Sequence, residues 1–390
     1  MMRYDTDARR TRLARRHHLA TAATTVEQVA SDLVGLHSSD PAAVYLAARA
    51  RVTDFHREDL ESSLYDRRTL VRMVGMRRTM FVVPIDLAAV MNAACTSALA
   101  PPERRRLVRM LEEQGIATDG PAWLTDVETR LVNALQARGE ATAVELTEDI
   151  AELGRKLRFG EGKSWGGEVG VSTRVLFMVA TNGRIVRARP RGTWLSSQYR
   201  WALTSDWLAT DLAAIPADEA AANLATRWLR TYGPGTFTDL KWWTGWTVAK
   251  TRAALAEVGP DEVDLGGGTI GYVLASDEEP DEPPAPWVAL LPGLDPTVMG
   301  WKERDWYLGS HQARLFDRNG NAGPSVWVDG RIVGGWAQHS DGEVVYRILE
   351  DVGQERVDRI ALEADRLGRW LGDYRITPRF RTPLDQELSA

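Results

Sequence analysis

Two polar side chains that stand two residues apart, His37 and Ser39, are the strongest candidates for chemistry in this sequence. They belong to the turn His-Ser-Ser-Asp at 37–40, between two predicted helices, the second of which begins at Pro41. Residues two apart in an extended turn face the same side, so we expect His37 and Ser39 to face one cleft while Ser38 faces away. A histidine accepts a proton from water near neutral pH, and a hydroxyl holds such a water in place. The spacing therefore predicts a water-binding site.

The carboxylate that follows, Asp40, gives the same turn two interpretations. Beside a water site it would stabilise positive charge that develops on a substrate. At a helix start, Asp40 or Ser39 can instead accept a backbone hydrogen bond and cap the helix, which is the commoner role for these residue types. The backbone N–H groups there also favour bound anions. His37, Ser39 and Asp40 are therefore the candidate catalytic residues, with capping as the alternative.

A second candidate surface is a basic ribbon, RIVRARPRG, at 184–192. No Asp or Glu occurs between residues 184 and 200, and Pro190 and Gly192 fit the tip of a loop. Guanidinium forks, hydroxyls and amides beside aromatic rings suit contacts with phosphate and sugar. A solvated charged hairpin is the alternative. The pattern favours a DNA-binding wing made of Arg184, Arg187, Arg189, Arg191, Ser197, Gln198 and Tyr199.

The net charge of −6 conceals a separation of charge along the 390 residues. Residues 1–84 hold 14 Arg and 10 acidic residues, and residues 150–205 hold 10 basic and 3 acidic residues. Residues 206–286 hold 5 basic and 14 acidic residues. A face built from the first two segments would attract a polyanion while the whole chain stays acidic.

Several classes of protein are excluded by what the sequence lacks. A single cysteine, Cys95, rules out an internal disulfide framework and a cysteine-rich zinc site. The other histidines show no metal-ligand spacing, so we expect neither metal nor cofactor. No apolar run approaches the roughly 20 residues of a membrane span, and no secretory signal opens the chain. We expect a cytoplasmic monomer that does not bind membranes. No lysine precedes Lys156, which argues against a Schiff-base nucleophile at the turn.

The elements that would position these residues repeat one order three times. Each round has helical segments followed by two strands, as in PAAVYLAARARV and then LVRMVGMRRTMFVV in the first round. This is the order of a winged helix. We expect the indole rings of Trp242, Trp243 and Trp246 to fill the core of the third round.

The last third of the chain has a different pattern. An acidic, proline-rich segment at 276–286 is typical of a linker, and Asp329-Gly330 between two β-rich runs predicts a hairpin, with a closing helix near 353–371. The predicted fold class is α+β, with three tandem winged-helix subdomains and a C-terminal, barrel-like, β-rich domain. The expected units are winged helix 1 with the candidate turn at 1–100, winged helix 2 with the basic wing at 101–205, winged helix 3 at 206–275, the linker at 276–286 and the C-terminal domain at 287–390.

Several segments, taken in order, resemble the winged-helix DNA glycosylases typified by AlkZ and YcaQ. These segments are GLHSSDPAAVYLAARAR, MRRTMFVV, GRIVRARPRGTWLSSQYRW, DLKWWTG, LLPGLDPTVMGWKERD and VDGRIVGGW, and they lie between residues 35 and 336. The resemblance implies a bacterial repair or antibiotic self-resistance enzyme that removes alkylated bases. That family carries Gln-x-Gln or Gln-x-Asp where this chain has His37 and Ser39, and there the motif positions the hydrolytic water.

The resemblance together with the chemistry predicts a monofunctional DNA glycosylase for N7-alkylated guanine in duplex DNA, with bulky, natural-product adducts as the expected lesions. An N7-alkylated purine is already cationic and leaves as a neutral base, so it needs only a placed water and a suitable electrostatic environment. The enzyme would be associated with the nucleoid when bound to DNA. The alternative is a non-catalytic winged-helix protein that regulates or binds damaged DNA.

Overall fold

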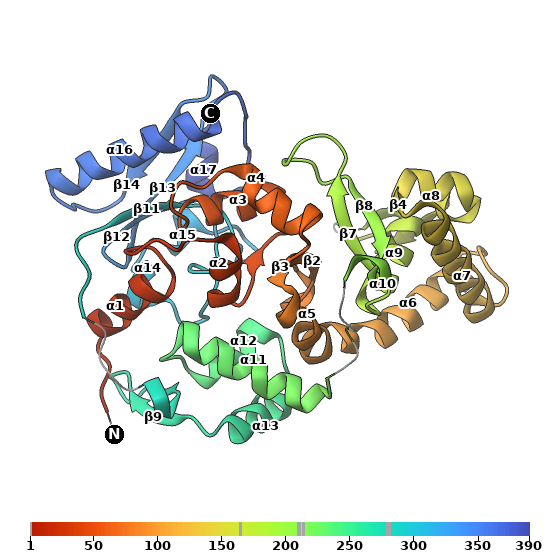
Figure 1. Cartoon of the computed structure of the whole chain (residues 1–390), viewed down its shortest axis with the longest axis horizontal. Coiled ribbons are helices and arrows are strands. Elements are labelled where there is room, and N and C mark those ends of the chain that lie inside the picture. The colour runs from red at the N-terminus through yellow and green to blue at the C-terminus, as the bar shows by residue number, and fades with distance from the viewer. Residues whose placement is uncertain (1, 164–165, 209–211, 213–214, 278–281) are drawn as a thin grey trace.

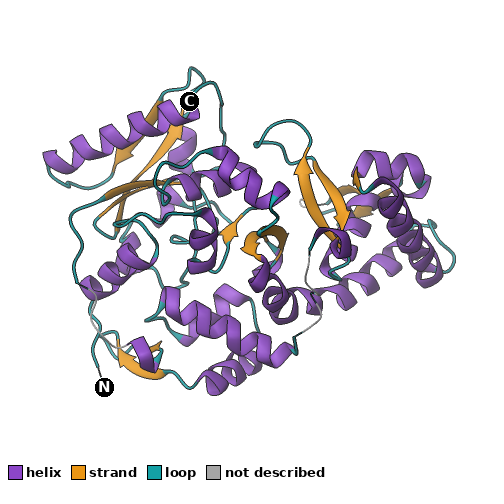
Figure 2. Cartoon of the chain, in the orientation of Figure 1, coloured by secondary structure: helices purple, strands orange, loops and turns teal. Residues whose placement is uncertain are grey.

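The computed structural model describes residues 2–163, 166–208, 212, 215–277 and 282–390, which form a mixed α+β fold (Figures 1 and 2). The candidate turn lies in the first group of elements. Thr25 caps helix α2 by accepting a hydrogen bond from the Gln28 N–H. The elements of this group are α1 (Thr6–Arg16), α2 (Val26–Asp32), β1 (Leu36–His37), α3 (Pro41–Arg49), α4 (Arg57–Glu61), β2 (Leu70–Val74), β3 (Met80–Pro84) and α5 (Ile85–Met91).

The second group of elements carries the basic ribbon. Strands β7 and β8 form its antiparallel hairpin, and Arg191 N–H bonds to the Gln198 carbonyl across the loop. The long helix α6 and the β5–β6 hairpin were not expected from the sequence. The elements are α6 (Ala100–Glu113), α7 (Gly120–Arg138), β4 (Glu140–Thr142), α8 (Ala143–Asp149), β5 (Lys156–Phe159), β6 (Gly167–Gly170), α9 (Val171–Thr181), β7 (Ile185–Pro190), β8 (Tyr199–Leu203) and α10 (Thr204–Trp207).

The first two groups share one six-stranded sheet in the order β1-β3-β2-β7-β8-β4. Their junction is the pairing of Arg72 in β2 with Arg187 in β7. Most apolar residues of the second group still form their own buried cluster, separate from the large cluster that joins the rest of the chain. The shared sheet thus fixes the basic hairpin directly beside the strands that carry the candidate turn (Figure 1).

The third group packs beneath the first (Figure 1). Its helices are α11 (Ala217–Tyr232), α12 (Phe237–Thr244) and α13 (Val248–Val258), and its strands are β9 (Asp261–Asp264) and β10 (Ile270–Val273). The Trp243 and Trp246 side chains are buried, as predicted, and the Trp246 indole N–H donates to the Ala94 carbonyl of the first group. Trp242 departs from the prediction, because its ring is only partly buried and lies at the edge of a cavity.

The C-terminal part forms an antiparallel sheet, β11-β12-β13-β14, covered by a long helix. The predicted hairpin at Asp329-Gly330 and the closing helix are both present. The sheet is open, so in the described residues it does not close into the expected barrel; four short strands are too few to wrap around a core. Within the predicted linker, residues 278–281 lie outside the described part. The elements are β11 (Val288–Leu291), α14 (Asp305–Leu308), α15 (Gln312–Leu315), β12 (Ser325–Val328), β13 (Arg331–Gln338), β14 (Val344–Ile348), α16 (Gln354–Leu371) and α17 (Pro383–Leu388).

Candidate active site

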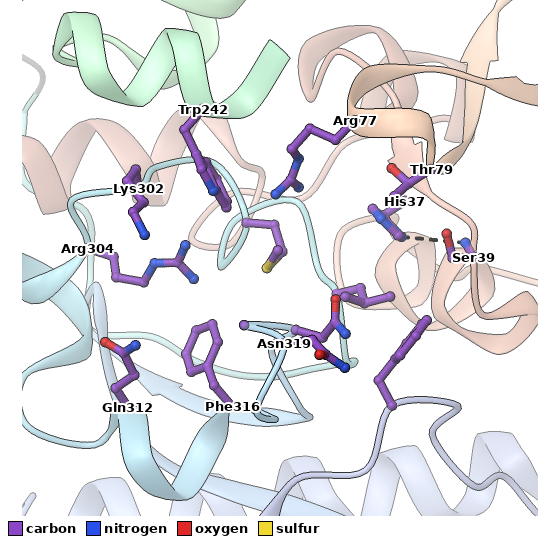
Figure 3. A pocket seen from close by; sticks show the side chains of 15 residues that line it. His37, Ser39, Arg77, Thr79, Trp242, Lys302, Arg304, Gln312, Phe316 and Asn319 are labelled. Atoms are coloured by element: carbon purple, nitrogen blue, oxygen red, sulfur yellow. Dashed lines mark hydrogen bonds between the residues drawn. The ribbon is translucent and has the colours of Figure 1, made fainter. Parts of the chain in front are cut away.

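The candidate turn opens into a cavity of about 330 Å³ that lies where the first group, the third group and the C-terminal part meet (Figure 3). His37 and Ser39 both line it, and Ser38 does not. The walls therefore come from segments that are as far as 343 residues apart in the chain. The lining residues are His37, Ser39, Arg77, Thr79, Trp242, Leu294, Met299, Lys302, Arg304, Gln312, Phe316, Asn319, Gly320, Asn321 and Phe380.

The His37 side chain is held at the cavity wall as a neutral imidazole. It is the last residue of β1, 5% exposed, with its ring 5.1 Å from the Phe81 ring. Burial, and then the charge of Arg77, lower the pKa of His37 from 6.5 to about 3. The Ser39 N–H donates to His37 Nδ1 at 3.5 Å, a long bond that leaves Nε2 carrying the proton of the neutral ring. At neutral pH, His37 therefore presents a neutral polar group to the cavity.

The two serines of the turn point in opposite directions, as their spacing predicts. Ser39 lines the cavity, and its Oγ accepts a 3.3 Å bond from the Met80 N–H of β3, which leaves the hydroxyl proton free to donate. Ser38 is buried on the other side, where Arg72 Nη1 donates to its Oγ at 2.9 Å. The turn is thus pinned to the sheet from both faces.

Asp40 has the capping role that the sequence left open. Its Oδ1 accepts from the Ala42 N–H at 3.0 Å and so caps α3, and its Oδ2 accepts from the Arg379 N–H at 3.0 Å. Arg379 also donates to the Ser39 carbonyl. Asp40 does not line the cavity, and backbone N–H groups on either side occupy its carboxylate. It fastens the candidate turn to the C-terminal segment.

The opposite wall of the cavity is basic, which sequence reasoning missed. Arg77, Lys302 and Arg304 line it around Trp242, and none of the described lining residues is Asp or Glu. The lack of lysine before Lys156 does not keep lysine from the site, because the fold brings Lys302 to the cavity from the C-terminal part. A signal was present in the sequence: MRRTMFVV, DLKWWTG and LLPGLDPTVMGWKERD, three of the segments that carry the family resemblance, contain all four residues.

The basic hairpin has a mixed environment. Arg189 is paired with Glu61 at 2.7 Å and with Asp66 at 2.9 Å, so acidic residues of the first group already neutralise its charge. Arg187 stacks on Tyr199 and Trp201, and burial lowers its pKa to about 10. The exposed members of the predicted wing are Arg184, Arg191, Ser197 and Gln198, while Tyr199 is buried.

Positively charged side chains lie between the wing and the candidate turn. Arg72 and Arg379 both lie close enough to Arg187 to lower its pKa. Arg379 in turn holds Ser39 and Asp40 of the candidate turn. Arg187, Arg72 and Arg379 thus lie near one another between the hairpin of the second group and the candidate turn.

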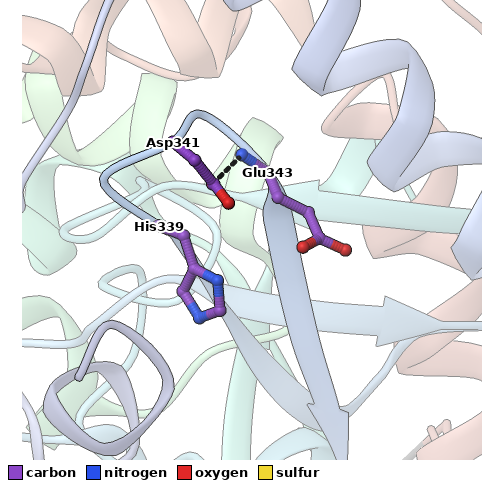
Figure 4. A group of neighbouring side chains, drawn as sticks. All are labelled: His339, Asp341 and Glu343. Carbon is purple, nitrogen blue, oxygen red and sulfur yellow. Dashed lines mark hydrogen bonds between the residues drawn. The ribbon is translucent and has the colours of Figure 1, made fainter.

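One group of side chains among the described residues has the geometry to hold a metal ion. His339, Asp341 and Glu343 lie at the β13–β14 turn, with potential ligand atoms within 4.8 Å of one another (Figure 4). His339 Nε2 is bonded to the Leu388 carbonyl at 2.7 Å, and the two carboxylates are exposed. None of the three lines the cavity of His37. No helix in the described part has the length and apolar character needed to cross a membrane.

Comparisons with known proteins agree with this arrangement. The model of the family described as DNA glycosylase AlkZ-like matches residues 30–370. Among solved structures, the chain is similar to the Streptomyces sahachiroi DNA glycosylase AlkZ, with 21% sequence identity and a TM-score of 0.72. The likeness covers 97% of this chain and 100% of that chain, and at this identity it concerns the fold. No curated protein matches the sequence.

Proposed function

This chain belongs to the AlkZ-like DNA glycosylase family, and from that premise we propose that it is a monofunctional enzyme that releases N7-alkylated guanine from duplex DNA. The reaction breaks the bond between C1′ of the deoxyribose and N9 of the alkylated base. Water adds to C1′, its proton passes to solvent, and the base departs as a neutral molecule. We further propose bulky, natural-product adducts as substrates, in repair or antibiotic self-resistance.

The observation that carries this proposal is the absence of an acid among the described residues that line the cavity. Release of an unmodified purine needs a group that protonates the departing base. The imidazole of His37, with a pKa of about 3, is neutral at pH 7, and its remaining N–H is too weak an acid to protonate the base; the guanidinium and ammonium groups are weak acids too. A base that alkylation has already made cationic needs no such proton, so N7-alkylated purines suit this site.

We propose that His37 and Ser39 hold the attacking water. The Ser39 hydroxyl keeps a free proton. The long bond between the Ser39 N–H and His37 Nδ1 is weak, and it breaks when the imidazole moves its proton from Nε2 to Nδ1. In that tautomer, Nε2 accepts a hydrogen bond from the water. A base with a pKa near 3 takes up little proton, so His37 orients the water rather than storing its proton.

The monofunctional assignment is compatible with Lys302 in the same cavity. A lysine that forms a Schiff base is normally desolvated, so that its amine is neutral and nucleophilic. Lys302 is exposed to solvent, and Figure 3 shows it across the cavity from His37 and Ser39. We therefore propose that water, rather than an amine, attacks C1′, and that borohydride does not trap a covalent complex with DNA.

We propose that each group of helices and strands is a winged helix and that the basic hairpin of the second contacts duplex DNA. The order helix, strand, two helices and a β-hairpin in residues 120–203, with the short β5–β6 hairpin inserted between the two helices, supports this interpretation. The positive charges of Arg187 and Arg379 would guide the backbone towards the cavity. Such an enzyme would act as a monomer in the cytoplasm, on the nucleoid.

The test is incubation with duplexes that carry single N7-alkylguanine lesions of increasing size, followed by mass detection of the freed base. We expect release of the intact alkylated base and an abasic site, without strand cleavage. Release of unmodified or uncharged bases at the same rate would contradict the argument from the missing acid. Tight binding to lesions without release from any duplex would instead support a non-catalytic damage-binding protein.

A further inference from the structure

The basic wall of the cavity is built around one aromatic ring. The guanidinium carbon of Arg77 lies 4.1 Å from the centre of the Trp242 ring, and that of Arg304 lies 5.0 Å from the same ring. Arg304 also lies 4.8 Å from the Phe316 ring. Stacking on rings fixes the plane of each guanidinium and leaves its N–H edge free for a ligand. Figure 3 shows the Arg77 and Arg304 side chains extending towards the cavity from different segments.

Neither guanidinium has an acidic or hydrogen-bonding partner within the described residues. Arg304 is 8% exposed, yet its charge is paired with no carboxylate there, and the buried Nε of Arg77 has no hydrogen-bond acceptor. A buried charge without a partner is costly, so most buried arginines in proteins are paired. The two cations are also close enough that Arg304, after burial itself, helps to lower the pKa of Arg77 to about 10.

Nearby carboxylates are committed elsewhere. Asp239 Oδ1 accepts from the Lys302 and Glu303 N–H groups, and its Oδ2 accepts from the Thr236 N–H. Asp317 accepts from the N–H groups of Asn319 and Asn321 and so closes the loop that forms the cavity floor. These acids shape the wall, and their carboxylates do not neutralise the two guanidinium groups.

We propose that Arg77 and Arg304, stacked on Trp242, form a binding site for a phosphate group within the cavity, with Lys302 at its open side. This inference rests on the proposed function and deepens it, because DNA supplies phosphates on both sides of the damaged nucleotide. Each planar guanidinium binds two phosphate oxygens side by side, and Lys302 adds a point charge. A phosphate bound there neutralises the wall, which otherwise repels a cationic base, and sets the sugar between the wall and the turn of His37.

The chemistry is shared by a phosphate of the DNA backbone and by free phosphate, so the experiment has two arms. The first titrates the full-length protein with inorganic phosphate and follows binding by calorimetry. The second measures affinity for a duplex with a tetrahydrofuran abasic analogue, in which each flanking phosphate in turn is replaced by a neutral methylphosphonate. Neither arm requires base release, so failure of the phosphate site is distinguishable from failure of the glycosylase proposal.

Three variants are compared with the wild type: Arg304→Gln, Arg77→Gln and Arg304→Lys. The last keeps the charge and loses the planar fork, and it also serves if Arg304→Gln fails to fold. The matched control is Arg369→Gln, which removes an equal charge from an exposed position on α16. A hydrogen bond to a charged group is worth about tenfold or more in affinity, so each cavity variant should lose at least that much.

At one methylphosphonate position, wild-type affinity should fall about tenfold or more, and Arg304→Gln should then cause little further loss. That non-additivity assigns the site to a backbone phosphate. If the losses in duplex affinity from the methylphosphonate and from Arg304→Gln add at every position, and only the cavity variants bind inorganic phosphate more weakly, the site belongs to free phosphate. Additive losses at every position together with unchanged phosphate binding in all variants would overturn the proposal.

Discussion

The most direct test of the candidate turn is to separate its chemical role from its structural role. His37→Phe keeps the ring volume and the contact with Phe81 but removes both nitrogens, and Ser39→Ala removes the hydroxyl. His37→Gln introduces the residue type that the family motif carries at this position. Thr79→Val is the matched control, because Thr79 lines the same cavity but its hydroxyl donates to the Met76 carbonyl.

The magnitudes expected from the two roles differ widely. Loss of a group that holds the reacting water costs ~10²–10⁴ in rate, which corresponds to about 3–5 kcal/mol of barrier. In its structural role, the Ser39 hydroxyl accepts one 3.3 Å hydrogen bond from the Met80 N–H. Loss of that bond should lower the free energy of unfolding by about 1 kcal/mol or less, and, in a chain of this length, Tm by no more than about 2 °C. A large loss of rate with a small loss of stability thus indicates chemistry.

The assay is single-turnover base release from an N7-alkylguanine duplex, with lesion affinity and thermal unfolding measured on the same samples. We expect His37→Phe and Ser39→Ala to bind the lesion with unchanged affinity and to react at least ~100-fold more slowly. His37→Gln should recover most of the rate, and Thr79→Val should stay within about threefold of the wild type. A wild-type rate in His37→Phe would refute the reasoning and place the attacking water elsewhere in the cavity.

Three further predictions follow from the charges of the structure. Because burial holds the pKa of His37 near 3, single-turnover rates should show no break near pH 6.5. In the unfolded chain the His37 imidazole takes up a proton below pH 6.5, so the free energy of unfolding should fall as pH drops from 6.5 towards 3, by about 2–3 kcal/mol at pH 4.5. Urea unfolding of His37→Phe should show less of this loss. Excess EDTA should leave base release unchanged, since His339 and its neighbours do not line the cavity; loss of activity that one divalent ion restores would count against this. Arg191→Ala should lower the slope of log DNA affinity against log salt concentration by about 0.9. The charge of Arg189 is already paired with Glu61 and Asp66, so Arg189→Ala should lower stability and leave that slope nearly unchanged. The opposite pattern would mean that Arg189 separates from Glu61 and Asp66 to bind DNA.

The order of elements around the candidate turn was accessible from local sequence signals. Pro41 at the first position of α3 and Asp329-Gly330 in the hairpin act through backbone geometry within a few residues, so they need no tertiary information. The alternation of directions at His37, Ser38 and Ser39 is also a local property. These parts of the prediction are confirmed.

Other features depended on pairing between distant segments. The Asp40 carboxylate had two plausible uses, and only the approach of Arg379, more than 300 residues away, shows that backbone groups occupy it. The partial burial of Trp242 could not be distinguished from the burial of Trp243. The two rings lie on neighbouring faces of α12, and only the packing of distant segments decides which face is core and which is cavity edge. The joining of two groups into one sheet rests on a single pairing, β2 with β7.

The sequence by itself determined the local geometry and the candidate water site, because capping, turn chemistry and side-chain alternation are set by neighbouring residues. It also determined that the segments around the turn and the basic hairpin carry excess positive charge. Only the tertiary structure decided the electrostatics of the cavity. Lys302 and Arg304 lie more than 260 residues after His37, and the pKa of a group depends on the burial and charges that folding brings around it. The basic wall exists because packing brings cations from two distant segments around the Trp242 ring of a third, while hydrogen bonds draw their neighbouring acids away.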